Sequence, residues 1–369
     1  MKHLFILFYF LIISFSSYSQ RAAKYIRHAE LKVKQGDFAG ALADYNIAIE
    51  KKPEAQTYSN RGNLKFLLSD FSGSLADYNQ AIKLQPDYAP AYFLRGVFKC
   101  KADNSQEGII DFDKAISLRS DYVEAYFNRG LSKTKLEDYP GALIDYAKAI
   151  ELNFINAECY FGLAFSKSKM KDYSGAIQAF SKAIEANPNY ADAYQNRGVA
   201  KDELGDASGA FQDYTRAIEL QPDYFAYYRN AKTRVRSENY AKALEDYNKA
   251  IEIGTNDADS YYYRASVKYN LKNYAGALED YSKAIDLLLN NSNVYFGRAL
   301  AKNQLGDDKG AVEDYNKAIE LKPDDGEAYF NRGAAKFNLM NRSGGCADWD
   351  MAVKLGYSKA DSFLRTYCK

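Results

Sequence analysis

Residues 191–224 read ADAYQNRGVAKDELGDASGAFQDYTRAIELQPDY, and most of the chain repeats this stretch. Related copies follow one another every 33 or 34 residues. Self-similarity at this period is typical of a repeat architecture, in which small units stack on their neighbours. We number positions within a copy from its first residue. The ten copies begin near Ala22, Ala55, Ala89, Val123, Ala157, Ala191, Tyr224, Ala258, Ser292 and Gly326.

A few positions hold the same kind of residue in every copy. Position 4 is always tyrosine, position 8 is glycine or alanine, position 24 is aromatic and position 27 is alanine. Positions 4, 8 and 11, and positions 20, 24 and 27, have the spacing of one helical stripe. Position 16 is always Asp or Asn, which predicts an N-cap for the second helix. Prolines such as Pro222 stand where that helix must end. Each copy is therefore predicted to be an antiparallel helix pair.

This pattern resembles the tetratricopeptide repeat (TPR) family over residues 22 to about 359. The resemblance implies an all-α fold, a right-handed superhelical solenoid of about ten helix-turn-helix repeats whose first helices line a concave groove. It also implies that the groove holds peptides or protein surfaces. We expect one solenoid over residues 20–369, closed by a capping helix at 358–369, because Ala360, Phe363, Leu364 and Tyr367 have helical spacing.

Positions 7 and 23 are predicted to form a salt bridge inside each repeat. Position 7 is usually arginine and position 23 usually aspartate, as in Arg61 and Asp77. The fifth copy has Leu163 and Ala179 instead, and a joint loss is expected because a single half-buried charge is costly. Position 11 is always Lys or Arg. We interpret this ladder as structural, with apolar stems over the core and charges in water.

Composition argues against an enzyme and against an electrostatic nucleic-acid binder. The 49 basic and 48 acidic residues leave a net charge of +1, so no bulk field attracts nucleic acid or an anionic membrane. Only two histidines occur, and we expect His28, at position 7 of the first copy, to face Asp44. No phosphate loop, nucleophile elbow or metal-ligand spacing appears. We therefore predict no catalytic residue, no metal and no cofactor.

Residues 1–19 are interpreted as a secretory signal peptide. A short positive start precedes the apolar run Leu4–Ile13, and a serine-rich stretch follows. Ten apolar residues are too few to span a bilayer, and Ser17 and Ser19 fit cleavage before Gln20. The alternative is a membrane anchor that is never cut. No later segment is apolar enough to span a membrane, so we expect an exported protein, periplasmic, surface-bound or secreted, from a bacterium.

Export would permit a disulfide between Cys346 in the last repeat and Cys368 in the cap. The alternative is two buried free thiols. Cys100 and Cys159 lie in different repeats at unmatched positions, and we expect both to stay free.

The candidate binding surface consists of groove-facing aromatic and basic residues. Core packing is supplied by positions 4 and 24, so the aromatic residues at position 5 would be surplus apolar surface. The alternative is that they pack against the adjacent first helix. Lysines at position 13 in the early repeats would suit an apolar, acidic segment, although such a run can also be a solvated face. The candidate residues are Phe93, Phe127, Phe161, Tyr228, Tyr262, Phe296 and Phe330 with Lys101, Lys135 and Lys169.

We therefore hypothesise a non-enzymatic scaffold that binds peptide or protein partners in its groove. The family's carboxylate clamp for chaperone C-termini needs a lysine at position 5, and no copy has one. The alternative function is an exported accessory protein that binds cell-wall glycan, since rows of aromatic rings can stack on sugars. Sugar binding should survive high salt, whereas binding to a lysine-lined groove should weaken.

Overall fold

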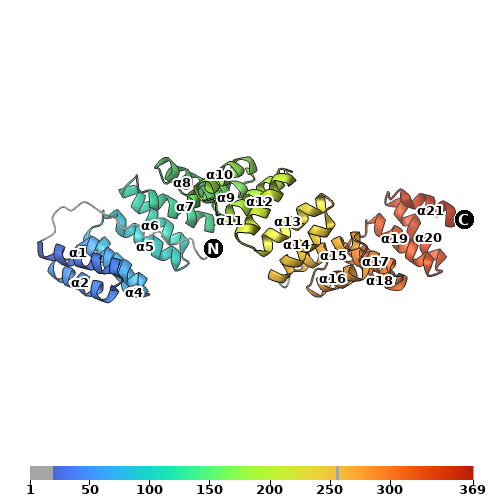
Figure 1. Ribbon diagram of the computed structural model, residues 1–369, viewed down its shortest axis with the longest axis horizontal. Helices are drawn as coiled ribbons and strands as arrows, with labels where there is room; N and C mark the ends of the chain where they lie inside the picture. Colours follow the sequence, from blue (N-terminus) through green and yellow to red (C-terminus); the bar gives the residue numbers. More distant parts are fainter. Residues whose placement is uncertain (1–19, 255–256, 369) are drawn as a thin grey trace. The chain divides into compact units, whose positions relative to one another are not determined.

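A computed structural model describes residues 20–254 and 257–368, and its regular elements over these ranges are all α-helices (Figure 1). The predicted signal peptide, residues 1–19, lies outside the described residues. The chain divides into two compact units, one ending at Ala186 and the other beginning at Asn187. Each unit is described by itself below.

The described part of the first unit, residues 20–186, contains ten helices, which pair as five repeats. They are α1 (Gln20–Gln35), α2 (Phe38–Lys51), α3 (Ala55–Leu67), α4 (Phe71–Leu84), α5 (Ala89–Lys101), α6 (Ser105–Leu118), α7 (Val123–Lys135), α8 (Tyr139–Glu151), α9 (Ala157–Lys169) and α10 (Tyr173–Ala186).

The described part of the second unit contains five further pairs and one last helix. They are α11 (Ala191–Glu203), α12 (Ala207–Leu220), α13 (Tyr224–Arg236), α14 (Tyr240–Ile253), α15 (Ala258–Asn270), α16 (Tyr274–Asp286), α17 (Ser292–Gln304), α18 (Asp308–Leu321), α19 (Gly326–Asn338), α20 (Arg342–Lys354) and α21 (Lys359–Tyr367).

The turn inside each repeat is fixed by two neighbouring residues. Position 16 caps the second helix, as where Asp206 accepts a hydrogen bond from the backbone N–H of Gly209 at 2.8 Å. Asn239 has the cap position without this side-chain bond. Position 15 adopts left-handed backbone angles, from φ 55° at Glu238 to φ 83° at Gly205. Such angles reverse the chain between the two helices.

The core of each repeat is formed by small residues and one aromatic ring. Alanines at position 27 are almost fully buried, and so are the rings at position 24, such as Tyr146 and Phe180. Small residues let the helices approach closely, and the ring fills the space beside them. Position 4 differs from the expectation, because its tyrosines are only half-buried. The core role expected of position 4 therefore belongs to position 24.

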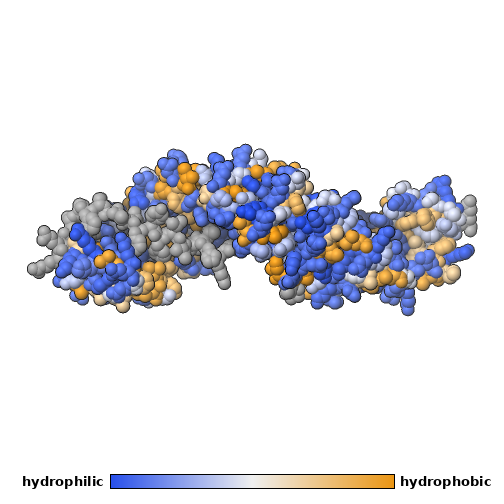
Figure 2. Space-filling model, in the orientation of Figure 1, coloured by the Kyte–Doolittle hydropathy of each residue, from blue (hydrophilic) through white to orange (hydrophobic). Residues whose placement is uncertain are grey.

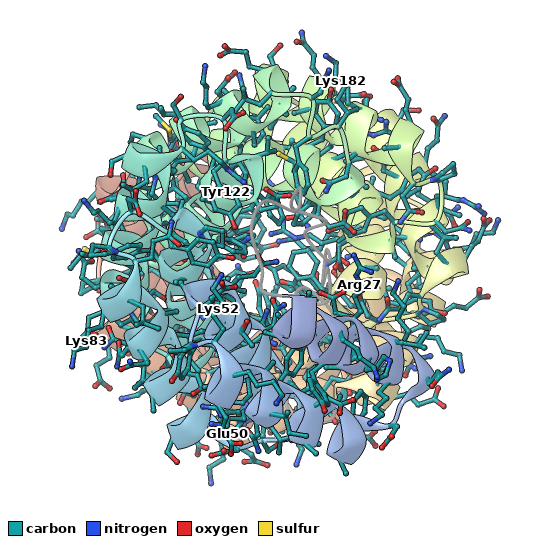
Figure 3. The ribbon with its side chains drawn as sticks, turned by 90° about the vertical axis from the view of Figure 1, so that its left-hand side faces the viewer. Arg27, Glu50, Lys52, Lys83, Tyr122 and Lys182 are labelled. Atoms are coloured by element: carbon teal, nitrogen blue, oxygen red, sulfur yellow. A yellow bond between two sulfur atoms is a disulfide. The ribbon has the colours of Figure 1, made fainter. Side chains whose placement is uncertain are left out.

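The first helices of successive repeats lie side by side within each unit, for example α5 with α7 and α13 with α15. In the first unit, Arg27 of α1 and Tyr122, which precedes α7, point inward (Figure 3). Lys83 of α4 and Lys182 of α10 point outward in the same view. We call the surface formed by positions 2, 6, 9 and 13 of the first helices the inner face.

The last helix, α21, closes the array at its C-terminal end. Phe363 of this helix packs with its ring centroid 5.5 Å from that of Trp349 and 5.0 Å from that of Phe330. A disulfide joins Cys346 of α20 to Cys368, with the Cα atoms 5.6 Å apart. Both contacts hold α21 over the last repeat, as a terminal cap must be held.

Candidate binding surface

A bidentate ion pair between positions 7 and 23 recurs in seven repeats. The Arg61 Nη2 lies 2.6 Å from Asp77 Oδ1, and its Nε donates to Oδ2 at 2.8 Å. This hydrogen bond raises the pKa of the Arg61 guanidinium. The predicted bridge is thus present, with the aspartates almost fully buried. The other six pairs are Arg95–Asp111, Arg129–Asp145, Arg197–Asp213, Arg264–Asp280, Arg298–Asp314 and Arg332–Asp348.

The lysine at position 11 completes this cluster, which corrects one expectation. Lys65 Nζ lies 2.9 Å from Asp77 Oδ2, and Lys268 Nζ lies 2.8 Å from Asp280 Oδ2. The ladder is structural, as interpreted, but its charges are paired with buried aspartates instead of reaching water. One aspartate therefore holds two cations, and both of its oxygens are satisfied.

Six of these arginines also donate to position 25 of the preceding repeat in the same unit. Arg61 Nη1 donates to Asn46 Oδ1, at position 25 of the preceding repeat, at 2.7 Å. Arg264 makes the equivalent bond to Asn248 at 2.9 Å. The guanidinium also lies over the tyrosine at position 4, 5.3 Å from the ring centroid of Tyr58 for Arg61. The tyrosine at position 4 thus packs against the arginine, outside the core.

The first and fifth repeats lack this arginine and use other partners. His28 is exposed, and Asp44, its expected partner, is bound by Lys32 at 2.7 Å. The longer lysine reaches the carboxylate that the imidazole was expected to face. In the fifth repeat, where position 23 is alanine, Lys167 turns to the helix cap Asp172 at 2.8 Å.

The seventh repeat has an incomplete cluster. Asn230 replaces the arginine and donates one hydrogen bond to Asp246 at 3.0 Å, while Arg234 Nε lies 3.2 Å from the same carboxylate. Burial raises the pKa of Asp246 to about 6, against the opposing charge of Arg234. The Thr215 hydroxyl, at position 25 of the preceding repeat, is buried without a hydrogen-bond partner among the described residues. Asn230 is too short to supply the bond that arginine makes elsewhere.

The aromatic residues at position 5 pack on the position 24 ring of their own repeat. The ring centroids of Phe93 and Phe112 are 6.0 Å apart, and those of Phe296 and Tyr315 are 5.8 Å apart. Phe161, Tyr228 and Tyr262 make the same contact. Phe127 is 8% exposed, and the other six are half-buried, including Phe330, which packs on the cap. Six of these rings are therefore partly exposed, and the rings at position 5 are not surplus to the core.

The three candidate lysines are exposed at the ends of α5, α7 and α9. Lys135 pairs with Asp103 of the preceding repeat. Lys101 Nζ lies 4.9 Å from the ring centroid of Phe66, and Lys169 Nζ lies 5.3 Å from that of Phe165. Their charges are thus already in contact with their own chain.

The basic side chains of helix α13 were not among the candidate residues. Its residues Tyr224–Arg236 include four basic and no acidic side chains, and Arg229 stands one residue before the usual arginine position. The sequence already shows that this helix differs from the others, because only the seventh copy has both Asn at position 7 and Arg at position 6.

The remaining candidate chemistry is sparse. Cys100 and Cys159 are free thiols, and burial raises the pKa of Cys159 to about 12. Within the described residues, no cluster of three or more metal-ligating side chains occurs, and no helix is both long and apolar enough to cross a membrane. Over the visible face of each unit, hydrophobic residues form separate patches among hydrophilic ones (Figure 2).

Family models match most of the repeats. A model described as TPR repeat matches residues 62–99, 169–205 and 299–339, and two models described as tetratricopeptide repeat match residues 228–292, and 123–156 with 191–224. Together these segments cover more than half of the chain. The chain belongs to the tetratricopeptide repeat family. A search of curated proteins gave no match.

Solved TPR structures are similar to parts of this chain. The C-terminal part of a TPR repeat-containing protein from Cytophaga hutchinsonii is 19% identical, with 65% of this chain and 98% of that one aligned at a TM-score of 0.54. A tetratricopeptide repeat protein from Parabacteroides merdae is 19% identical over 66% and 96% of the two chains, at 0.47. YrrB, a TPR protein with an unusual peptide-binding site, is 24% identical over 50% and 95%, at 0.45. The TPR array supports a protein-interaction scaffold.

Proposed function

We propose that this TPR protein is an exported, non-enzymatic scaffold whose inner face binds peptide segments of partner proteins. One observation carries the proposal. The positions that build the repeat are refilled with the same residues, whereas the inner-face positions change from copy to copy. Position 13, for example, is lysine in repeat 5, glutamate in repeat 6 and asparagine in repeat 8. Successive stretches of the inner face therefore offer different charges to a bound segment.

Site-specific photo-crosslinking tests which face is used. Benzoylphenylalanine replaces Asn270, which is exposed at position 13 of α15, or Lys249, whose side chain is 57% exposed on α14. Both variants are expressed in the cells that make the protein, and adducts are identified by mass spectrometry. Protein adducts from the Asn270 variant, with few from the Lys249 variant, are the expected result.

Two outcomes contradict the proposal. Adducts that form equally from both positions, or only from Lys249, would move binding away from the inner face. Adducts from neither position, combined with salt-resistant retention on insoluble cell-wall glycan, would favour the glycan-binding alternative. Export is tested separately, by fractionating cells and sequencing the N-terminus of the mature protein.

A further inference from the structure

Helix α13 carries a basic stripe on the inner face of the second unit. Phe225, Arg229, Lys232 and Arg236 are spaced by four, three and four residues, so they lie on one side of the helix. The stripe extends about 16 Å at 1.5 Å per residue. The same four positions in α11, α15, α17 and α19 hold no basic residue, and four of them are acidic: Asp192, Glu203, Asp259 and Glu327.

Arg229 has no carboxylate partner among the described residues. Its Nε is buried without a hydrogen bond, and its guanidinium lies 5.0 Å from the ring centroid of Phe225. The four arginines at position 7 in the second unit all bind aspartates. A half-buried cation without a counter-charge is unfavourable for the folded protein alone. Its cost would be offset by an anion that binds there.

Lys232 is the second cation of the stripe without a carboxylate partner in the described residues. Its Nζ lies 5.5 Å from the ring centroid of Tyr228 and 4.7 Å from that of Tyr263. Arg236, the third, already pairs with Asp202. Two cations beside half-buried tyrosine rings thus remain available to a ligand that combines negative charge with apolar surface.

A polar group beneath the stripe also lacks a partner. Tyr214 is fully buried, and its hydroxyl makes no hydrogen bond within the described residues. Burial raises the pKa of this phenol, Asp202 raises it further, and Arg229 and Arg236 oppose the shift. Asp202, Arg229 and Arg236 are therefore close enough to act on this buried hydroxyl, which has no hydrogen bond in the described residues.

We propose that the α13 stripe binds a carboxylate side chain of an acidic peptide segment, with Arg229 and Lys232 as its counter-charges and Tyr228 and Tyr263 as apolar neighbours. The proposal rests on the inner face being a peptide-binding surface. In this proposal the acidic segment binds repeat 7, and not the candidate lysines at position 13 of the early repeats. A nucleic acid fits less well, because the flanking acidic side chains Asp192 and Asp259 would repel a continuous polyanion.

Fluorescence anisotropy tests the charge requirement. The probe is a fluorescein-labelled 12-residue peptide in which Glu alternates with Leu and Gly, and the matched peptide has Gln at every Glu position. We expect the Glu peptide to bind the full chain at least tenfold more tightly than the Gln peptide, and to weaken between 50 and 300 mM NaCl. Equal binding of the two peptides would overturn the proposal.

Matched variants locate the site. R229Q/K232Q is expected to weaken binding of the Glu peptide at least tenfold, whereas K249Q/K317Q, with the same charge change at outer lysines paired to Glu252 and Glu320, should change it less than twofold. K232Q alone serves if circular dichroism shows that the double variant is unfolded. Equal loss in both variants would contradict the proposal.

Two further results separate the hypotheses. A 12-nucleotide RNA that binds more tightly than the Glu peptide, and is released by R229Q/K232Q, would replace the peptide with nucleic acid and overturn the proposal. Inner-face adducts at Asn270 with unchanged peptide binding in R229Q/K232Q would retain the proposed function and reject the α13 site. No adducts at Asn270, combined with unchanged peptide binding in R229Q/K232Q, would reject both the proposed function and the α13 site.

Discussion

Repeats 7 and 8 lie next to each other, share the same helix pair and differ in where they place one arginine. In repeat 8, Arg264 and Lys268 bind both carboxylate oxygens of Asp280. In repeat 7 the arginine stands one residue earlier, at Arg229, and Asn230 takes its place. One residue rotates a side chain by about 100° around a helix. The shift therefore weakens an internal cluster and adds a cation to the inner face.

The largest expected effect breaks the cluster of repeat 8. Arg264→Leu leaves Asp280, which is 4% exposed, paired with Lys268 alone among the described residues, and we expect a loss of about 3 kcal/mol in the free energy of unfolding. Asn230→Leu in repeat 7 should cost only about 1 kcal/mol, because it removes one hydrogen bond. Urea unfolding followed by circular dichroism measures both, and hydrogen exchange in α15 and α16 localises the first loss.

A double variant is the control for this difference. Arg264→Leu with Asp280→Ala reproduces the natural state of repeat 5, which has Leu163 and Ala179. It should be more stable than Arg264→Leu alone, because no buried charge is stranded. Equal losses from Arg264→Leu and Asn230→Leu would mean that the two clusters contribute alike, and the comparison would fail.

The sequence predicted the repeat, the helix caps and the pair at positions 7 and 23, because each depends on contacts within about thirty residues. It did not predict that Lys268 and its equivalents bind the same aspartate, since helix spacing does not show how far a flexible side chain extends across to the second helix. The sequence left two alternatives for Cys346 and Cys368, a disulfide or two free thiols, because bond formation depends on how α21 packs on the last repeat.

The second prediction uses pH to sharpen the comparison. The folded-state pKa of Asp246 is raised to about 6, above the unfolded value near 3.9. Its charge therefore destabilises the fold above pH 6, and this penalty disappears as the pH falls toward 4. Between pH 7 and pH 5, wild type should gain about 1 kcal/mol relative to Asp246→Asn, which cannot ionise. Urea midpoints across this range measure the difference.

The groups around Asp246 supply a second variant for the pH test. Arg234 and Asn230 favour its charge, and the neighbouring Glu245 disfavours it. Asn230→Arg should restore the bidentate pair seen in repeat 8. The pH dependence of this variant's stability should therefore be closer to that of Asp246→Asn than the wild type's is. Parallel stability curves for wild type and Asp246→Asn would show that Asp246 does not titrate in this range.

The binding surface was harder to predict than the fold. The seven aromatic residues at position 5 have the spacing of a surface row, yet Phe93 and Phe127 pack on rings of their own second helix. A sequence pattern shows on which side of a helix a residue lies. It does not show which neighbouring side chain covers that residue. Arg229 was visible in the sequence as an exception, but its missing partner could be recognised only once every aspartate nearby had been placed.

The smallest expected effect concerns how the two repeats end. Repeat 8 leaves α16 through Leu288, which is 88% exposed at φ 69°, whereas Gly254 follows α14 in repeat 7 at φ −116°. Leucine has no local hydrogen bond to offset a left-handed conformation, but asparagine tolerates it. Leu288→Asn should raise the free energy of unfolding by about 0.5 kcal/mol. Asn153, at the same position of repeat 4 with φ 70°, gives the reciprocal control, since Asn153→Leu should lower it by a similar amount. If urea midpoints move in the same direction for both changes, backbone strain at this exit is not what separates the repeats.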